Sequence, residues 1–138
     1  MNLSSEIAEQ VVAAAREEAL KTGVPMNIAV VDGGGYLKAF IRMDGAVLGS
    51  IDLALRKAKT AILFGMNSEQ VFEFCKPGGP AFGLEQTNGG LAVFPGGIPL
   101  RNAAGEVIGA IGVSGGAVSQ DFSVAEVGAA AAFPKQSK

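Results

Sequence analysis

The stretch MNIAVVDGGGYLKAFIRM, residues 26–43, decides the fold of this chain. A short run rich in β-branched residues, Met26 to Val31, enters Asp32-Gly33-Gly34-Gly35, and a second alternating run follows from Tyr36 to Met43. Two such runs joined by a glycine-rich turn predict a β-hairpin. Because side chains alternate between the faces of a strand, one face of the second run carries rings and cations, namely Tyr36, Lys38, Phe40 and Arg42. We expect that face to meet a ligand or a partner.

Helical patterns lie on both sides of the hairpin. Apolar residues recur at helical spacing from Leu3 to Ala15, and Thr22-Gly23 ends that pattern. Ser50 can cap a second helix that continues to Phe64-Gly65. The apolar stripe predicted for this second helix consists of Ile51, Leu55, Ala58 and Ile62. A capping-box spacing at Asn67 predicts a short third helix as far as about Cys75.

The rest of the chain predicts two more strands and a last helix. The strands are expected at Ile98 to Arg101 and Val107 to Val113, and the helix from about Ser119 to Ala132. Since short turns join the strands, the order of elements predicts an α+β fold with a mostly antiparallel sheet of about five strands. No linker or repeat interrupts this order, so we expect one domain over residues 1–138.

Composition excludes several classes of chemistry. The chain has no histidine, which removes Ser-His-Asp and Cys-His nucleophiles and every His-ligated metal. Its net charge of −2 offers no basic stripe for nucleic acid and no polybasic membrane anchor. A single cysteine and a start without signal-peptide features favour the cytoplasm. Only 17% of residues are charged, so we expect a homo-oligomer that covers apolar surface.

Three local motifs each have a structural and a functional interpretation. Gly112-Val113-Ser114-Gly115-Gly116 matches G-x-S-x-G, but without histidine we interpret Ser114 as a turn residue. Residues 32–35 could form an anion-binding nest, although a plain hairpin turn is the more common use of Asp-Gly. Cys75 is interpreted as a small buried hydrophobe or, next to Lys76, as a reactive thiolate. No metal site is expected.

The irregular, Gly/Pro-rich tract over residues 77–97 is the leading pocket candidate, because long irregular segments in compact domains are usually functional or disordered. We expect it to combine with the residues that follow the second hairpin strand. The candidate ligand-binding residues are Arg42, Asp44, Lys57, Gly78, Gly79, Phe82 and Asn88. Surface ion pairing of Arg42 with Asp44, and a solvated Lys57, are the alternatives.

Six blocks in order carry a resemblance to a known family, and they begin with Val30-Val31-Asp32-Gly33-Gly34-Gly35-Tyr36-Leu37 and end with Gly109-Ala110-Ile111-Gly112-Val113-Ser114-Gly115-Gly116. Between them stand Arg42-Met43-Asp44-Gly45-Ala46 with Gly49-Ser50-Ile51-Asp52, Lys57-Ala58-Lys59-Thr60-Ala61, Pro77-Gly78-Gly79-Pro80, and Phe94-Pro95-Gly96-Gly97-Ile98-Pro99-Leu100-Arg101. The series closely resembles the GlcG/HbpS family, also described as a haem-binding or haem-degrading domain and found at the C-terminus of PduO-type proteins.

The resemblance implies profilin-like α/β/α layers, assembly into dimers or larger rings, and a bacterial cytoplasmic or catabolic setting. Members are linked to haem or corrinoid handling. This chain departs from the pattern at Tyr36, where many relatives carry a histidine associated in some members with iron ligation. Tyrosine can bind haem iron as a phenolate, although packing at the end of the hairpin is the simpler interpretation of Tyr36. No cofactor is therefore required, and haem remains an option through Tyr36.

Three functions follow as hypotheses, and the third is a structural or regulatory assembly protein with an empty pocket. In the first, the chain binds a small ligand, either a tetrapyrrole or a small organic acid, without the usual histidine; Arg42 pairs with a carboxylate and aromatic side chains cover its apolar body. In the second, it is a metal-free catabolic enzyme that catalyses tautomerisation, isomerisation or elimination, with Tyr36, Glu69 and Glu85 as candidate acids or bases.

Overall fold

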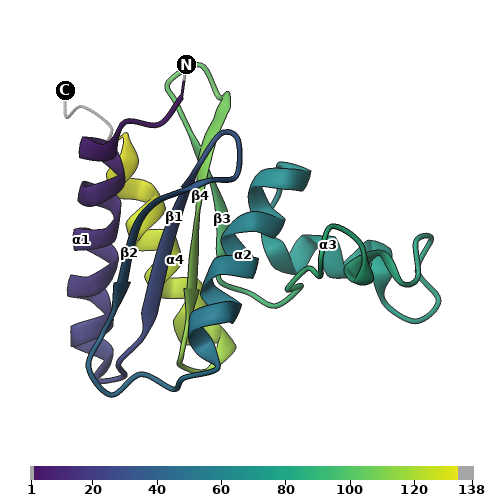
Figure 1. Ribbon diagram of the computed structural model, residues 1–138, viewed down its shortest axis with the longest axis horizontal. Coiled ribbons are helices and arrows are strands. Elements are labelled where there is room, and N and C mark those ends of the chain that lie inside the picture. The colour runs from purple at the N-terminus through teal and green to yellow at the C-terminus, as the bar shows by residue number, and fades with distance from the viewer. Residues whose placement is uncertain (1, 134–138) are drawn as a thin grey trace.

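The computed structural model describes residues 2–133, which form an antiparallel sheet between helices, with an arm projecting to one side (Figure 1). Four helices, four strands and one short 3-10 helix make up the described chain. Their bounds are α1 Ser5–Thr22, β1 Asn27–Asp32, β2 Leu37–Arg42, α2 Ser50–Phe64, α3 Ser68–Cys75, η1 Leu84–Gln86, β3 Gly97–Arg101, β4 Val107–Ser114 and α4 Val118–Ala132. Every helix and strand predicted from the sequence is present, within about two residues at most ends.

The sheet has the order β2-β1-β4-β3, and all three neighbouring pairs are antiparallel. The α+β class is therefore confirmed, with four strands where the sequence suggested about five. β1 lies in the middle, with Asn27 opposite both Arg42 and Ser114. β2 pairs with β1 alone and forms one edge of the sheet.

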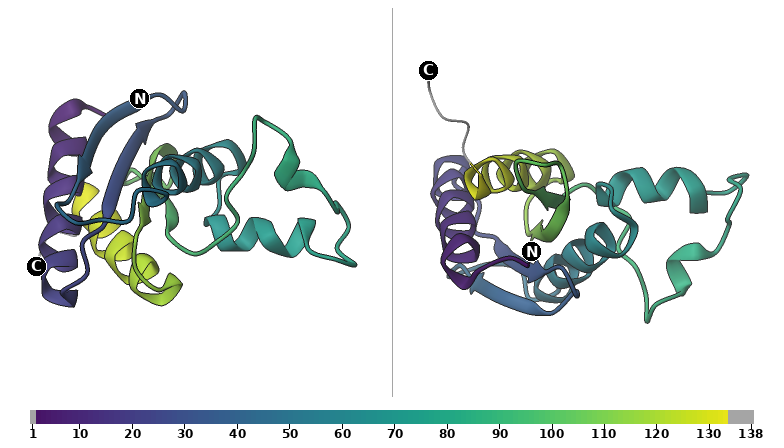
Figure 2. Two further views of the ribbon diagram at one scale, coloured as in Figure 1. Left: turned by 60° about the horizontal axis from the view of Figure 1, so that its bottom comes forward. Right: turned by 90° about the horizontal axis from the view of Figure 1, so that it is seen from above.

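Helices cover the two faces of the sheet differently (Figure 2). α1 and α4 pack against each other on one face, over a core of larger apolar side chains that includes Val11, Ile28, Ile111 and Val124. α2 lies on the opposite face, over β1, β3 and β4. The result is a three-layer α/β/α arrangement, as the family resemblance implied.

α2 approaches the sheet closely because small residues line the contact. Ala29 and Ala110 of the sheet pack with Ala54, Ala58 and Ala61 of the helix. At Gly112 there is no room for a side chain, since an added Cβ would sit 2.0 Å from the carbonyl oxygen of Ala54.

The predicted apolar stripe of α2 is partly wrong. Ala58 is buried as expected, whereas Ile51, Leu55 and Ile62 are only half-buried. The buried positions of α2 also include Lys57. The close approach of α2 to glycine and alanine selects its small residues for burial and leaves its large ones at the margin.

The turn between β1 and β2 is a hairpin turn closed by its own carboxylate. Asp32 Oδ1 accepts hydrogen bonds from the backbone N–H groups of Gly34 and Tyr36 at 2.9 and 3.0 Å. Gly33 N–H donates to Asn2 Oδ1, and Gly35 N–H donates to the carbonyl of Asp32. All four N–H groups are engaged, so the turn does not offer them to an anion.

We define the arm as residues 66–90, which comprise α3, η1 and the turns around them. It extends away from the layers in each view (Figures 1 and 2). Ser68, at the first turn of α3, joins the arm to the sheet: its hydroxyl accepts from Gly97 N–H at 2.9 Å and donates to the carbonyl of Phe94. Arg56 and Lys59 of α2 donate to the carbonyls of Gly89 and Asn88. The arm is thus fixed at both of its ends.

Candidate functional site

A groove runs between α1 and the edge strand β2, and we call it the α1–β2 groove. Two adjoining cavities of about 380 and 450 Å³ form it, and they share Arg16 and Ile41 in their walls. One wall is formed by α1 residues, among them Val12 and Leu20, and the other by residues 38–43. Its dimensions and mixed lining are typical of a site for a small organic molecule.

Local structure explains why this groove exists. α1 begins at a cap in which Ser4 Oγ accepts from Ile7 N–H at 3.2 Å, and it ends at Gly23 in the left-handed conformation. Its buried residues, such as Val11 and Ala15, face the sheet, whereas Arg16 is exposed beside them. Since β2 has no strand on its outer side, the space between β2 and α1 is open to solvent.

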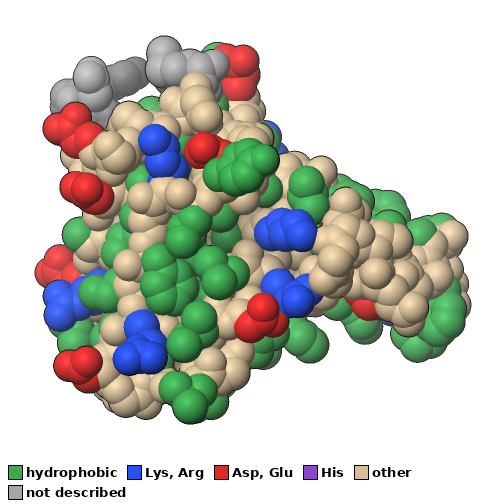
Figure 3. Space-filling view, in the orientation of Figure 1, with side chains coloured by type: hydrophobic (Ala, Val, Ile, Leu, Met, Phe, Trp, Pro, Cys, Tyr) green, Lys and Arg blue, Asp and Glu red, His purple; other side chains and the backbone are tan. Residues whose placement is uncertain are grey.

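Three cations in the groove distinguish it from the rest of the described surface. Residues 2–133 contain nine Lys and Arg side chains, and six of them hold a carboxylate or a backbone carbonyl. The other three have no ion pair or hydrogen bond within this part of the chain, and all three line the groove: Arg16, Lys38 and Arg42. Lys and Arg side chains stand beside a run of apolar side chains on this side of the molecule (Figure 3). Such a surface suits an anion with an apolar body.

The structure places two of the predicted ligand-binding residues in this groove. Arg42 and Asp44 both line the end of the groove near Pro25, and they form no ion pair with each other among the described contacts. Sequence reasoning assigned no role to Arg16, which looked like one of many charges on the outer side of a helix. Lys38 was recognised only as part of a mixed strand face, and the alternation of β2 was the signal that located it.

Tyr36 does not join Arg42. The two residues lie at opposite ends of β2, roughly 20 Å apart along the strand, and Tyr36 is 77% exposed at the hairpin turn. Tyr36 lines neither part of the groove. Tyr36, Arg42 and Phe82 of one chain therefore do not line a common cavity, because Tyr36 and Arg42 are six positions apart along an extended strand and Phe82 lies in the arm.

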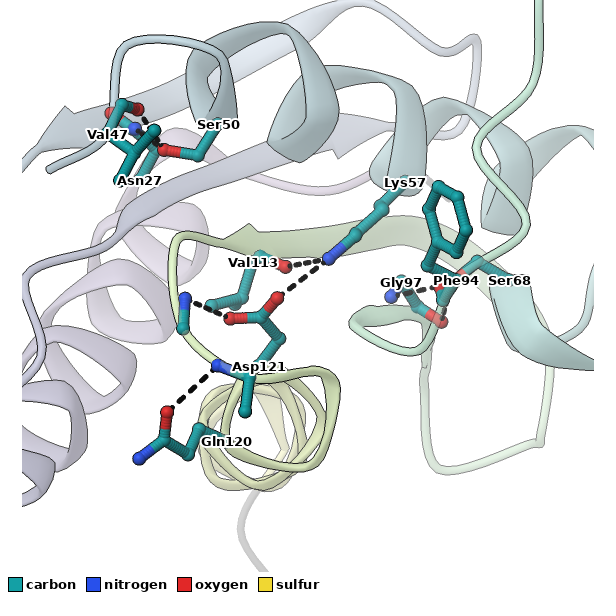
Figure 4. Close-up of polar contacts among 12 residues, drawn as sticks. Asn27, Val47, Ser50, Lys57, Ser68, Phe94, Gly97, Val113, Gln120 and Asp121 are labelled. Carbon is teal, nitrogen blue, oxygen red and sulfur yellow. Dashed lines mark hydrogen bonds and ion pairs between the residues drawn. The ribbon is translucent and has the colours of Figure 1, made fainter.

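Lys57, a candidate ligand-binding residue with a solvated side chain as the alternative, is in fact buried, so the solvated alternative is wrong. Only 2% of its side chain is exposed, and its Nζ lies 2.9 Å from both Asp121 Oδ2 and the carbonyl oxygen of Val113 (Figure 4). Asp121 Oδ1 in turn accepts from Gly116 N–H. Burial lowers the pKa of Lys57 and raises the pKa of Asp121, while the contact between the two opposes both shifts. Lys57 joins α2 to α4 across the sheet and does not reach the groove.

The remaining predicted ligand residues lie in the arm. Gly79 packs against the end of α3, where an added Cβ would meet the carbonyl oxygen of Phe74 at 2.7 Å, and Gly78 precedes it with a positive φ. Phe82 is 73% exposed. Asn88 adopts φ 55° and offers its carbonyl to Lys59. These four residues belong to the arm, and they do not line the α1–β2 groove.

The candidate acids of the enzymatic hypothesis are also separated from Tyr36. Glu69 begins α3 and Glu85 lies in η1, so both belong to the arm. Glu85 contacts Cys75, whose thiol pKa is raised by burial first and by the Glu85 carboxylate second. A raised pKa disfavours the reactive thiolate form of Cys75, and the buried position fits the interpretation of this residue as a small hydrophobe.

The G-x-S-x-G motif at residues 112–116 has a structural role. Ser114 is 3% exposed at the end of β4, in register with Asn27, so its hydroxyl is not presented to solvent.

No cluster of three or more Cys, Asp or Glu side chains that could hold a metal ion occurs in residues 2–133. Within the same range, no helix combines the length and apolar character needed to cross a bilayer.

By its fold and its groove, this chain is a three-layer α+β protein with a cationic groove beside its edge strand. The model of the family described as "Haem degrading protein HbpS-like" matches residues 3–130, and the chain belongs to this family.

Two relatives from Citrobacter freundii and one solved structure agree with this assignment. A 15.0 kDa protein from the dhaT-dhaS intergenic region of Citrobacter freundii is 40% identical over 134 residues, covering 91% of this chain and 94% of the relative. The corrinoid adenosyltransferase PduO of the same organism is 36% identical over 95% of this chain, which spans only 39% of that protein. A crystal structure of a PduOC:haem complex superposes with a TM-score of 0.89 at 35% identity, covering 95% of each chain.

The groove residues match one part of a haem group and not the other. Arg16, Lys38 and Arg42 suit carboxylates such as propionates, and the apolar walls suit a flat hydrocarbon ring. For the iron, the groove holds Met43, but its Sδ already accepts from Met26 N–H at 3.4 Å. With no histidine in the chain and Tyr36 at the far end of β2, the described donor set does not fit iron ligation in this groove.

Proposed function

We propose that this chain is a small-ligand-binding protein of the HbpS type that holds an amphipathic organic anion, a tetrapyrrole or a smaller organic acid, in the α1–β2 groove. The observation that carries the proposal is the convergence of Arg16, Lys38 and Arg42, the three cations without a partner in residues 2–133, on one apolar-walled groove. The relative crystallised as a PduOC:haem complex supports a ligand of this chemistry.

Binding by this arrangement needs neither a metal nor a cofactor. The guanidinium groups of Arg16 and Arg42 can each donate two parallel hydrogen bonds to a carboxylate, and Lys38 adds a further charge. Val12 and Ile41 would contact the apolar body of the ligand. Each charged hydrogen bond contributes about 1.5–3 kcal/mol, so affinity arises from several such contacts together.

The wider setting is part of the same proposal. We expect the chain to act as one domain over residues 1–138 and as a homo-oligomer in the bacterial cytoplasm, within a catabolic context, and without nucleic acid or membrane partners. The family match over residues 3–130, the single cysteine and the net charge of −2 support this expectation.

Titration with a matched pair of porphyrins tests the proposal and separates it from iron ligation. Haemin and metal-free protoporphyrin IX, together with a panel of small aromatic and hydroxy acids, would be titrated by fluorescence quenching or calorimetry. We expect saturable binding, with haemin and protoporphyrin IX of similar affinity, since the groove recognises carboxylates and apolar surface. Binding of haemin alone, lost in Tyr36→Phe, would instead assign ligation to Tyr36.

Charge variants locate the site. Arg16→Gln and Arg42→Gln should each weaken binding by about tenfold or more, as expected for the loss of a charged hydrogen bond. Lys21→Gln is the matched control, because Lys21 lies on the same helix and pairs with Glu18 outside the groove lining. Failure of every compound to bind, or equal effects of Lys21→Gln and Arg16→Gln, would overturn the proposal.

A further inference from the structure

The arm carries the net charge of the whole chain. Residues 66–90 contain Glu69, Glu73 and Glu85 against the single Lys76, three negative charges against one positive, which equals the net charge of −2 for all 138 residues. The rest of the sequence is therefore balanced between acidic and basic side chains. The arm is acidic where the remainder of the molecule is neutral.

The arm also exposes aromatic side chains that it cannot cover itself. Phe72, Phe74 and Phe82 are 42, 43 and 73% exposed, and they account for three of the eight phenylalanines of the chain. Between α3 and η1 the arm leaves an apolar cavity of about 210 Å³ lined by Val71, Phe74 and Leu84 among others. A surface of this kind is expected to bury its rings against another molecule.

The complementary surface is the α1–β2 groove. It presents the three cations without partners in residues 2–133, and apolar side chains such as Ile41 lie between them. The acidic aromatic arm and the cationic apolar groove match in both charge and polarity. They lie at opposite ends of the long axis, so an arm cannot reach the groove of its own chain (Figure 1).

We infer that the arm of one copy docks over the α1–β2 groove of a second copy, with Phe72 and Phe82 against the apolar walls and the arm carboxylates facing Arg16, Lys38 and Arg42. This inference bears on the proposed function in one respect: the arm of the neighbouring copy and the ligand would use the same cations and apolar walls, so they would compete for the groove. The contact uses two different surfaces, so it is head-to-tail. Head-to-tail contacts repeat until a ring closes.

A capping experiment tests this geometry without any ligand. The arm variant is Phe72→Ser/Phe82→Ser and the groove variant is Lys38→Glu/Arg42→Glu; all four side chains are exposed, so both variants should fold. By light scattering after size exclusion, the wild type should be a multiple of the 14.0 kDa chain. Each variant alone should be a monomer. Mixed together, they should form a complex of two chains and nothing larger, because one intact arm meets one intact groove.

The other outcomes would overturn the inference. A monomeric wild type, assembly of either variant alone, or two variants that stay apart on mixing would each contradict a head-to-tail contact. Val118→Ser, which removes an apolar side chain that is 51% exposed on α4, is the control and should assemble like the wild type. Ligand titration of the monomeric arm variant keeps the two proposals separate: binding without assembly supports the groove as a ligand site even where docking fails.

Discussion

The layered body and the arm bury their side chains to very different extents. In the body, β1 is buried along almost its whole length, and a buried ion pair between Lys57 and Asp121 joins the helices of the two faces. In the arm, α3 buries Val71 and Cys75 while three phenylalanines face outward. The arm is nevertheless held in place by hydrogen bonds from α2. A segment that hydrogen bonds hold in place, but whose aromatic side chains remain exposed, is suited to contact another molecule.

The contrast predicts that substitutions in the body will cost stability, whereas substitutions at the outer surface of the arm will change association. Lys57→Met should give the largest effect. It leaves the Asp121 carboxylate buried without its cation, and breaking a buried pair in this way costs about 3–5 kcal/mol. Urea unfolding measures the loss. Lys59→Met on the same helix is the control, because Lys59 only holds a loop carbonyl.

Replacing both members of the pair should restore most of the stability lost in Lys57→Met, since Lys57→Met/Asp121→Leu buries no charge.

The stability of the double variant relative to the wild type should depend on pH. Burial raises the pKa of Asp121, so the native state binds a proton more tightly than the unfolded chain, and wild-type stability falls as pH rises from the ordinary value of 3.8 through the raised pKa.

Lys57 has the opposite effect on the pH dependence of stability. Burial lowers its pKa, so the unfolded chain holds the proton longer, and wild-type stability rises with pH between the lowered pKa and 10.5. Relative to the wild type, the free energy of unfolding of the double variant should therefore be highest near neutral pH. It should be lower relative to the wild type at acidic and at alkaline pH. Unfolding curves of both proteins across this range check the prediction, and a pH-independent difference would contradict the buried pair.

Gly112→Ala should have the next largest effect. Its Cβ would meet the Ala54 carbonyl oxygen at 2.0 Å and the Ala58 nitrogen at 2.5 Å, so α2 must move away from the sheet. Overpacking of this kind costs about 1–3 kcal/mol. Gly49→Ala is the matched control, because no atom lies within 4 Å of its added Cβ. Thermal unfolding of the two variants should separate them clearly, and equal midpoints would mean that the helix is not held so closely.

Phe82→Ser should have the smallest effect on folding. Its ring is 73% exposed, and such a surface change alters the free energy of unfolding by at most about 0.5 kcal/mol. The measurement is best made in the Lys38→Glu/Arg42→Glu background, so that association does not contribute to stability. A loss of several kcal/mol there would show that the arm does depend on this ring, and the contrast with the body would fail.

Local sequence patterns predicted most of the fold. The hairpin over residues 26–43 follows from alternation and from a turn whose first residue, Asp32, closes it by its own hydrogen bonds. Helix ends at Gly23 and Gly65 follow from the left-handed conformation that glycine adopts easily. The number of strands was overestimated, since the sequence does not show how many extended segments join one sheet.

The candidate site was predicted only where its residues are neighbours in sequence. Arg42 is the last residue of β2 and Asp44 lies two positions further on, so the two remain together in the groove. Arg16 joins them through the packing of α1 on the sheet, which no local spacing encodes. The burial of Lys57 depends in the same way on Asp121, 64 positions further along the chain. Periodicity assigned Lys57 to the solvent side of its helix because it takes no account of such distant partners.

The Lys57–Asp121 bridge has a consequence for how this sequence can change over generations. A lone substitution at either position leaves an unmatched charge in the interior, so intermediates with one replacement should be rare among descendants. The two positions are then expected to be inherited as a single character, kept together or exchanged together for an uncharged pair.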